Sequence, residues 1–300
     1  ALSLFPLMRE INAEIDANNF ILKYYDLLLS FFNIDNNISV VLTFMVSIVL
    51  IGSIINIFFD LYSNYVFSKI GSDLRIKLFN KILITKWLYF VEKKPGEILN
   101  SLILETQKTA GLYRGILECL SFFIQFIFYA SVSILISTQI SLITISIGLI
   151  IVLIFLSWNT KAKKSGKAYN LANQNLTTKI LDTVRNIKTI KASGKSNFLS
   201  DLFFKDFLNL QNSEYKMNSV LVYPKRLIEP LIVFFLAIGV YIIFKYEILN
   251  LGELIPIIFL FMRTIEKLTG VQRKYHYVKK MEPFYDSYNL NLKKIENLKE

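Results

Sequence analysis

Long apolar runs constrain this sequence more than any other feature. Five of them, at residues 38–59, 116–136, 140–158, 227–244 and 251–269, are each about as long as the ~20 residues that a helix needs to cross a bilayer. Residues 1–8 are apolar but too short, and are expected to be the end of a first helix that lacks its beginning. With 53% hydrophobic residues, the pattern excludes an ordinary soluble globular domain and predicts an all-α polytopic membrane protein.

The basic residues indicate how the chain is oriented. Of the 34 Lys and Arg residues, 31 lie in three polar segments, 69–114, 161–226 and 263–300, which alternate with the apolar runs. The positive-inside rule places these three segments in the cytoplasm. The net charge of +11 is therefore explained by topology, and no nucleic-acid partner is expected.

Two of these segments are long enough to be structures in their own right. Leu74, Leu78 and Ile82 repeat at helical spacing, and no proline or strong break occurs between Ile38 and Pro95. We therefore expect helices that continue from the spans, without a turn, as two cytoplasmic arms, 69–114 and 161–226. The alternative is a pair of amphipathic helices that lie on the membrane surface.

Few residues here are suited to chemistry. Gly194, Lys195 and Ser196 form the end of a phosphate-loop motif, but the required first glycine is Thr189. Gly194 is better interpreted as a left-handed helix cap. His276 and Cys119 are the only residues of their types, so a structural role is expected for both and no metal or catalytic site is predicted.

Two stretches resemble the arm motifs of ABC exporters. Residues 93–106, KKPGEILNSLILET, resemble the first arm's Gly-Glu-(Leu/Ile)-x-(Ser/Asn)-Arg motif, which an Asp follows four residues later. Ser101 replaces the arginine and Glu105 the aspartate, whereas the matching positions are Gly96, Glu97, Ile98 and Asn100. Residues 181–193, LDTVRNIKTIKAS, resemble the second arm, with Asn186 and Ser193 as departures and matches at Ile187, Ile190 and Lys191.

The resemblance implies a six-helix exporter membrane domain over residues 1–300, with the first helix truncated and 270–300 leading to a nucleotide-binding domain. It further implies a homodimer in a bacterial inner membrane. ATP and Mg would bind in the nucleotide-binding domain, since the motifs for them do not occur in this sequence. The residues expected to couple to that domain are Pro95, Gly96, Glu97, Ile98 and Asn100 in the first arm and Thr177, Ile180, Asp182 and Arg185 in the second.

Polar residues at the inner ends of the spans are candidates for a cargo cavity, because ionisable groups in membranes usually face a cavity or a partner. They are Asn56, Asp60, Lys225, Arg226, Glu229 and Arg263. The three bases could hold an anionic headgroup of an amphipathic, lipid-type cargo, or could simply extend to the membrane interface. The stretch 224–229 and Arg263 also resemble lipid-linked oligosaccharide flippases. The competing functions are a carrier or channel that is not driven by ATP, and a membrane-anchored enzyme.

Overall fold

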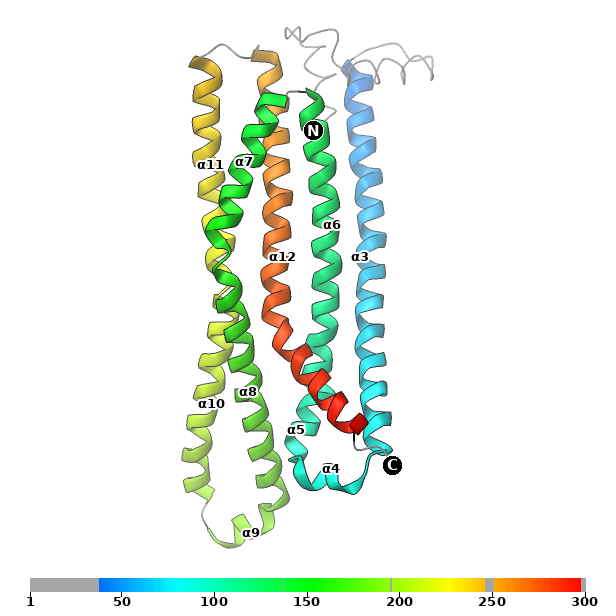
Figure 1. Ribbon diagram of the computed structural model, residues 1–300, viewed down its shortest axis with the longest axis vertical. Helices are drawn as coiled ribbons and strands as arrows, with labels where there is room; N and C mark the ends of the chain where they lie inside the picture. Colours follow the sequence, from blue (N-terminus) through cyan, green and yellow to red (C-terminus); the bar gives the residue numbers. More distant parts are fainter. Residues whose placement is uncertain (1–37, 137, 195, 246–250, 298–300) are drawn as a thin grey trace. The chain divides into compact units, whose positions relative to one another are not determined.

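The computed structural model describes residues 38–136, 138–194, 196–245 and 251–297. Every regular element within these ranges is a helix (Figure 1), which confirms the all-α fold class. Residues 1–8, predicted as the end of the first span, lie outside the described residues. The elements are α3 (Ile38–Leu83), α4 (Trp87–Glu92), α5 (Pro95–Asn100), the π-helical turn η1 (Ser101–Glu105), α6 (Thr106–Ile136), α7 (Thr138–Phe155), α8 (Trp158–Arg185), α9 (Ile187–Ala192), α10 (Ser196–Ser219), α11 (Val222–Lys245) and α12 (Leu251–Asn297).

Helix α3 is far longer than a bilayer requires. Its 46 residues correspond to about 70 Å at 1.5 Å per residue, against about 30 Å for the hydrocarbon core. Most of its large apolar side chains between Leu42 and Tyr65 are exposed, so they are available to lipid or to another chain. Within the described residues, three helical stretches are long and apolar enough to cross a membrane: Ser39–Leu83, Pro95–Leu135 and Ser141–Arg185. The spans at 227–244 and 251–269 stay predictions.

As expected, α3 runs unbroken from its span into the first arm. The expectation of unbroken helices is wrong farther along that arm, and it is wrong in the second arm at residues 156–157 and 220–221. Helix α3 ends at Leu83, well before Pro95, because the chain turns at Thr85 to bury Tyr89 against α3. A second turn at residues 156–157 separates α7 from α8, where Phe155 is buried with its ring 5.7 Å from the ring of Trp158. Tyr89 and Phe155 are buried next to these interruptions, and burial of their aromatic rings offsets part of the cost of the lost helical hydrogen bonds.

The chain divides into two compact units. The first contains the described residues up to Tyr62, together with Leu120–Ile154 and Arg226–Gln272. Here α6 and α7 form the predicted tight hairpin, with a 2.8 Å hydrogen bond between the hydroxyls of Ser133 and Ser141. Close helix packing follows from two glycines, because a Cβ at Gly148 or Gly270 would lie within 2.5 Å of a side chain on a neighbouring helix.

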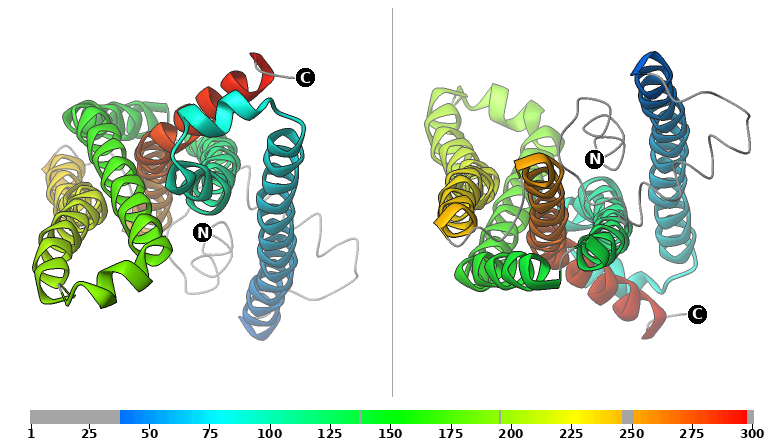
Figure 2. Two further views of the ribbon diagram at one scale, coloured as in Figure 1. Left: turned by 90° about the horizontal axis from the view of Figure 1, so that it is seen from below. Right: turned by 90° about the horizontal axis from the view of Figure 1, so that it is seen from above.

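The second unit contains Ser63–Cys119, Phe155–Lys225 and the described residues from Arg273 onward. One of its apolar clusters joins α3, α4 and the end of α12 through Leu78, Tyr89 and Tyr288, and Figure 2 shows α4 beside that end of α12. Another cluster joins α6, α10 and α12 through Leu112, Met217 and Phe284. The second unit is therefore held together by contacts between segments far apart in the sequence.

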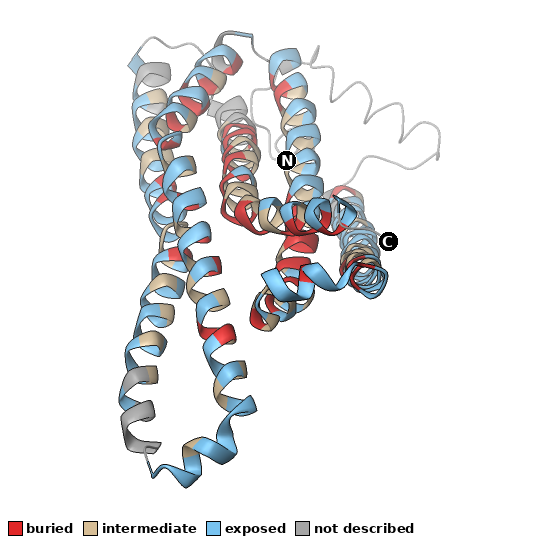
Figure 3. Ribbon diagram, turned by 60° about the horizontal axis from the view of Figure 1, so that its bottom comes forward, coloured by how far each residue is buried: buried red, intermediate tan, exposed pale blue. Residues whose placement is uncertain are grey.

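Helices α8 and α10 of the second unit run side by side and are joined by α9, with a 2.6 Å ion pair between Lys179 and Asp206. The end of this hairpin is largely exposed, whereas buried residues concentrate where α5, α6 and α12 meet (Figure 3). After α9, Gly194 has φ +66°. This confirms the expected left-handed cap, since glycine adopts that conformation without steric strain.

Candidate functional site

The first arm turns back toward the membrane through the short helix α5, which is fixed tightly against α8. Pro95 occupies the first turn of α5, where its missing N–H costs nothing. Gly96 is buried, and a Cβ at this position would lie 2.3 Å from Cα of Thr178. Only glycine allows this approach of the two backbones without a shift. A 2.8 Å ion pair between Lys93 and Glu97 closes the outer side of the turn.

Immediately after α5, the helix widens into the π-helical turn η1. The backbone N–H of Thr106 bonds to the carbonyl of Ser101, five residues earlier, so the turn holds one residue more than an α-helical turn. Turns of this kind are frequent at functional sites. Here the turn presents Ser101 and Glu105 together toward the interior, where both are buried.

Glu105 is the centre of a polar cluster inside the second unit. Its side chain is fully buried, and its contacts come from α5 and η1, from α8 and from α12. We call the following six residues the Glu105 cluster: Asn100, Ser101, Glu105, Asn170, Ser287 and Asn291.

Two hydroxyls make the shortest bonds to the Glu105 carboxylate. Ser101 Oγ donates to Oε2 at 2.7 Å, and Ser287 Oγ donates to Oε1 at 2.6 Å. Ser101 stands where the exporter motif has arginine, and Glu105 where it has aspartate. The two residues at these motif positions contact each other directly through a hydroxyl–carboxylate hydrogen bond.

Three amides complete the shell around the carboxylate. Nδ2 of Asn100 and Nδ2 of Asn170 each donate to Oε1 at 3.2 Å, and Nδ2 of Asn291 donates to Oε2 at 3.3 Å. Asn173 extends the network by donating to Oδ1 of Asn100 at 2.7 Å. Within the described ranges, no Lys or Arg lies within ion-pair distance of Glu105. Neutral donors satisfy this buried acid, which ties α5, α8 and α12 to one point.

The tip of the first arm is fastened to the end of α12 by separate contacts. Thr85 Oγ1 donates to the carbonyl oxygen of Ile295 at 3.3 Å, and Lys81 forms an ion pair with Glu296. Burial, reinforced by the negative charges of Glu97 and Glu105, raises the pKa of Tyr89 to about 12. Its phenol therefore stays neutral at physiological pH and packs as an aromatic side chain in the α4–α12 contact.

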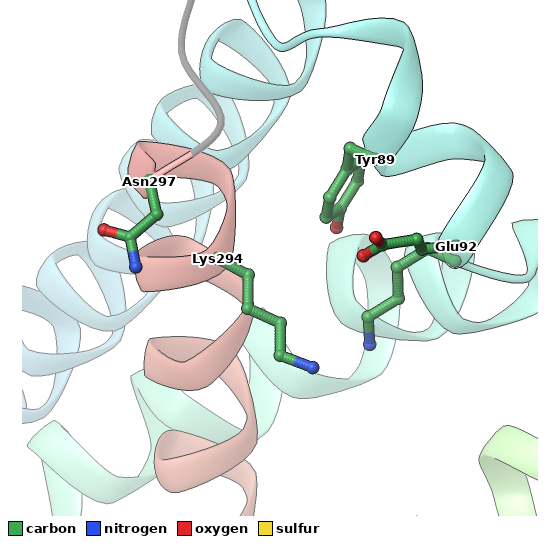
Figure 4. Close-up of a pocket in the computed structure, with 5 residues that line it drawn as sticks. Tyr89, Glu92, Lys294 and Asn297 are labelled. Atoms are coloured by element: carbon green, nitrogen blue, oxygen red, sulfur yellow. The ribbon is translucent and has the colours of Figure 1, made fainter.

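A small pocket opens between α4 and the last turn of α12. Its volume is about 250 Å³, and it is lined by Tyr89, Glu92, Lys93, Lys294 and Asn297. Figure 4 shows Tyr89 and Glu92 on α4, facing Lys294 and Asn297 on α12. Its mixed charges and small size do not indicate a particular ligand, and we interpret it as part of the α4–α12 contact.

Both short connecting helices expose apolar side chains. On α4, Trp87 is 77% exposed and Val91 66%. On and beside α9, Ile187 is 42% and Val184 60% exposed. Neighbouring exposed apolar groups of this kind are typical of a docking surface.

The structure separates the predicted coupling residues into two groups. In the first arm, Gly96 and Asn100 are buried and hold α5 in place, whereas Pro95, Glu97 and Ile98 are partly accessible. The second-arm residues, Thr177, Ile180, Asp182 and Arg185, all lie on the last turns of α8, next to α9. Contact of these residues with a nucleotide-binding domain stays a prediction.

The predicted cavity residues are placed as follows. Asn56 and Asp60 are exposed on α3, and Lys225, Arg226 and Glu229 are exposed on α11 with no ion pair among the described residues. Arg263 on α12 instead makes an ion pair with Glu266 at 2.8 Å and lies 5.0 Å from the ring centre of Phe259. The role of these residues in a cavity stays a prediction.

Sequence reasoning missed the partners of Glu105. Asn170, Ser287 and Asn291 are short polar residues, and nothing in a single sequence marks them as neighbours of residue 105. One signal was present: Ser287 and Asn291 are four residues apart, so they share a helix face with each other.

Three comparisons with known proteins agree with this geometry. The family model described as "ABC transporter transmembrane region" matches residues 17–268. The "Heterocyst differentiation ATP-binding protein HepA" of Nostoc sp. (strain PCC 7120) is 22% identical over 216 residues, which are 72% of this chain and 36% of that protein. A bacterial Atm1-family ABC exporter solved with ATP bound has a TM-score of 0.70 at 12% identity, covering 97% of this chain and 50% of that one. The chain thus spans only part of the length of either protein, and the structural likeness shows that it shares the exporter's membrane-domain fold.

Proposed function

Since this chain belongs to the family of ABC transporter transmembrane regions, we propose that it is the membrane domain of an ATP-driven exporter. Its helices would form the translocation pathway, and its arms would transmit motion from a nucleotide-binding domain that binds ATP and Mg. The chain's own residues would then position and move the helices, and would not hydrolyse ATP.

The observation that carries the proposal is the pair of short helices α4 and α9 with their exposed apolar side chains. A nucleotide-binding domain that moves the membrane helices needs a surface to bind, and a rigid element behind that surface to transmit the movement. Trp87 on α4 and Ile187 on α9 offer such contacts, since aromatic and aliphatic groups often anchor interfaces. The coupling surface then includes α4 and α9 in addition to the residues around 94–102 and 177–186.

The Glu105 cluster supplies the rigidity behind α4. Because its hydrogen bonds join α5, α8 and α12, a displacement of the first arm would move the second arm and the last helix as well. Closely packed interfaces tend to switch between discrete arrangements and not to deform gradually. Transmission through this point would therefore be concerted.

Several partners follow from the proposal. A second copy of the chain would cover part of the exposed apolar surface of α3 in a homodimer, with lipid covering the remainder. The location would be a bacterial inner membrane. The cargo would be amphipathic or anionic, of the lipid type transported by flippases, and would contact Asn56, Asp60, Lys225, Arg226, Glu229 or Arg263.

The alternative is a carrier or channel that does not use ATP. Such a protein needs a polar path through its spans, but α7 has only small hydroxyls, Gln139 and Gly148 among apolar residues. A carrier or channel that does not use ATP also gives no role to two arms that end in short helices with exposed apolar side chains.

Photo-crosslinking in the complete transporter tests the proposal. A photoreactive residue at Trp87 or at Ile187 should link to the nucleotide-binding domain, and the yield should change when ATP is added. Phe58 is the matched control, because it is 69% exposed on α3 but within a predicted span. Links from positions 87 and 187 to lipid alone would contradict the coupling role.

A further inference from the structure

Lys280 on α12 is the most deeply buried lysine that the structure describes, with 7% of its surface exposed. Its backbone is pressed against α8, since a Cβ at Gly166 would lie 2.2 Å from the carbonyl oxygen of Lys280. Its ammonium group lies 5.7 Å from the centre of the Tyr277 ring, one turn earlier on α12. Most of the Lys280 side chain is therefore packed within the protein, and little of it reaches water.

The side chains around Lys280 add positive charge and a hydroxyl. Tyr277 packs on α6, where a Cβ at Gly111 would lie 3.0 Å from the Tyr277 hydroxyl oxygen. Lys108 is three residues before Gly111 and so lies on the same face of α6. Burial first, and the charge of Lys108 second, lower the pKa of Lys280 to about 8.

Three other lysines on α8 and α12 are paired with carboxylates. Lys274 bonds to Glu118 at 2.6 Å, and Lys163 and Lys279 bond to Glu282 at 2.9 and 3.0 Å. Neither Lys280 nor Lys108 has a carboxylate within ion-pair distance in the part of the chain that the structure describes. The hydroxyl of Tyr277 likewise makes no hydrogen bond there.

The two ammonium groups of Lys280 and Lys108 are unfavourably placed unless an anion binds to them. A buried cation without a counter-charge is strongly destabilising, and a second cation nearby adds repulsion. An anion with several acceptor oxygens would relieve both effects, because it can accept from two ammonium groups and one phenol. Phosphate groups are commonly bound by lysine in this way.

We propose that Lys280, Lys108 and Tyr277 form a binding site for a phosphate group on the facing surfaces of α6 and α12. This site is separate from the predicted cavity residues, and it does not depend on the chain being an ATP-driven exporter. The phosphate could belong to a lipid headgroup or to a soluble phosphate compound, since the three residues contact only the phosphate oxygens.

The test measures binding to the complete transporter in phosphatidylcholine nanodiscs without ATP. One arm adds inorganic pyrophosphate, and the other incorporates phosphatidic acid. At least one ligand should raise the thermal unfolding midpoint of the wild-type protein. A response to pyrophosphate alone identifies a soluble ligand, a response to phosphatidic acid alone a lipid headgroup, and a response to both a site that recognises the phosphate itself.

Three substitutions make the test specific. Lys280→Met keeps the apolar stem and should weaken binding by about tenfold or more, as expected for one lost hydrogen bond to a charged group. Lys280→Arg should retain most of the binding. The matched control is Lys279→Met, which removes the adjacent, already paired lysine and should leave the affinity unchanged.

Lys280→Met should also raise the unfolding midpoint when no anion is present, because it removes a buried charge that has no partner. A lower midpoint would mean that the ammonium group has a structural partner within the protein, and would overturn the proposal. So would equal affinity of Lys280→Met and wild type, or no response of the wild type to either ligand.

Discussion

Replacing Glu105 with alanine tests whether the Glu105 cluster holds the arms together. The substitution removes both carboxylate oxygens and therefore five hydrogen bonds. Some donors keep other partners: Asn291 still reaches Ser101 Oγ at 2.5 Å, and Asn100 still reaches Asn170 at 3.2 Å. Among the residues that the structure describes, Ser287 has no other hydrogen-bond partner.

Two or three buried donors would thus be left without an acceptor, at about 1–3 kcal/mol each. Loss of the buried charge offsets part of this, so we expect a net destabilisation of about 3–5 kcal/mol. For a chain of this size that unfolds as one unit, it corresponds to a midpoint about 5–8 °C lower. Glu105→Gln keeps the shape and one acceptor oxygen, and should cost less than half as much.

The assay is thermal unfolding of the purified transporter, combined with hydrogen exchange of α5 and of the last turns of α12. The alanine variant should exchange faster in both segments, since they share the cluster. Glu92→Ala is the control, because Glu92 is exposed on α4 and should change stability by less than about 0.5 kcal/mol. If Glu105→Ala were as stable as Glu92→Ala, with unchanged exchange, the cluster would not be a structural joint.

Three further outcomes are expected. Gly96→Ala should destabilise the protein by about 1–3 kcal/mol, because its Cβ would lie 2.3 Å from the Thr178 backbone; Gly52→Ala, with open space around it, should be neutral or slightly stabilising in the same melting assay. Burial lowers the pKa of His276 to about 4, so between about pH 4 and 6.5 the unfolded state binds more protons than the folded state. The free energy of unfolding should therefore decrease as the pH falls through this window, by up to about 3 kcal/mol. A His276→Gln variant that keeps the same pH dependence would refute this assignment. Arg263→Ala should reduce cargo-stimulated ATP hydrolysis more than basal hydrolysis, whereas an equal loss of both would argue against contact with cargo.

The sequence was sufficient for features that depend on composition and local pattern. Apolar runs of bilayer length, basic segments between them and helical spacing predicted an all-α membrane domain with long helices. The cap at Gly194 was also predictable, since few residues other than glycine adopt a positive φ easily.

The features that were not predicted depend on contacts between distant segments. Helix α3 ends at Leu83 because Tyr89 packs on α3 and α12, and no local signal near residue 83 reveals that contact. The partners of Glu105 are up to 186 residues away in the sequence. Lys280 looks like any other base in a basic segment until its burial and its lack of an acidic neighbour are visible.

The π-helical turn η1 has a consequence for chain length. A deletion of one residue between Asn100 and Thr106 would restore an ordinary α-helical turn, and it would shorten the helix by about 1.5 Å and rotate the segments on either side by about 100° relative to each other. If Glu105 kept its buried partners, every lipid-facing residue of α6 would turn to a different side. If α6 kept its orientation, the Glu105 carboxylate would move away from its hydrogen-bond donors. The extra residue lets one continuous helix place Glu105 among its hydrogen-bond donors and also keep the orientation of the α6 span.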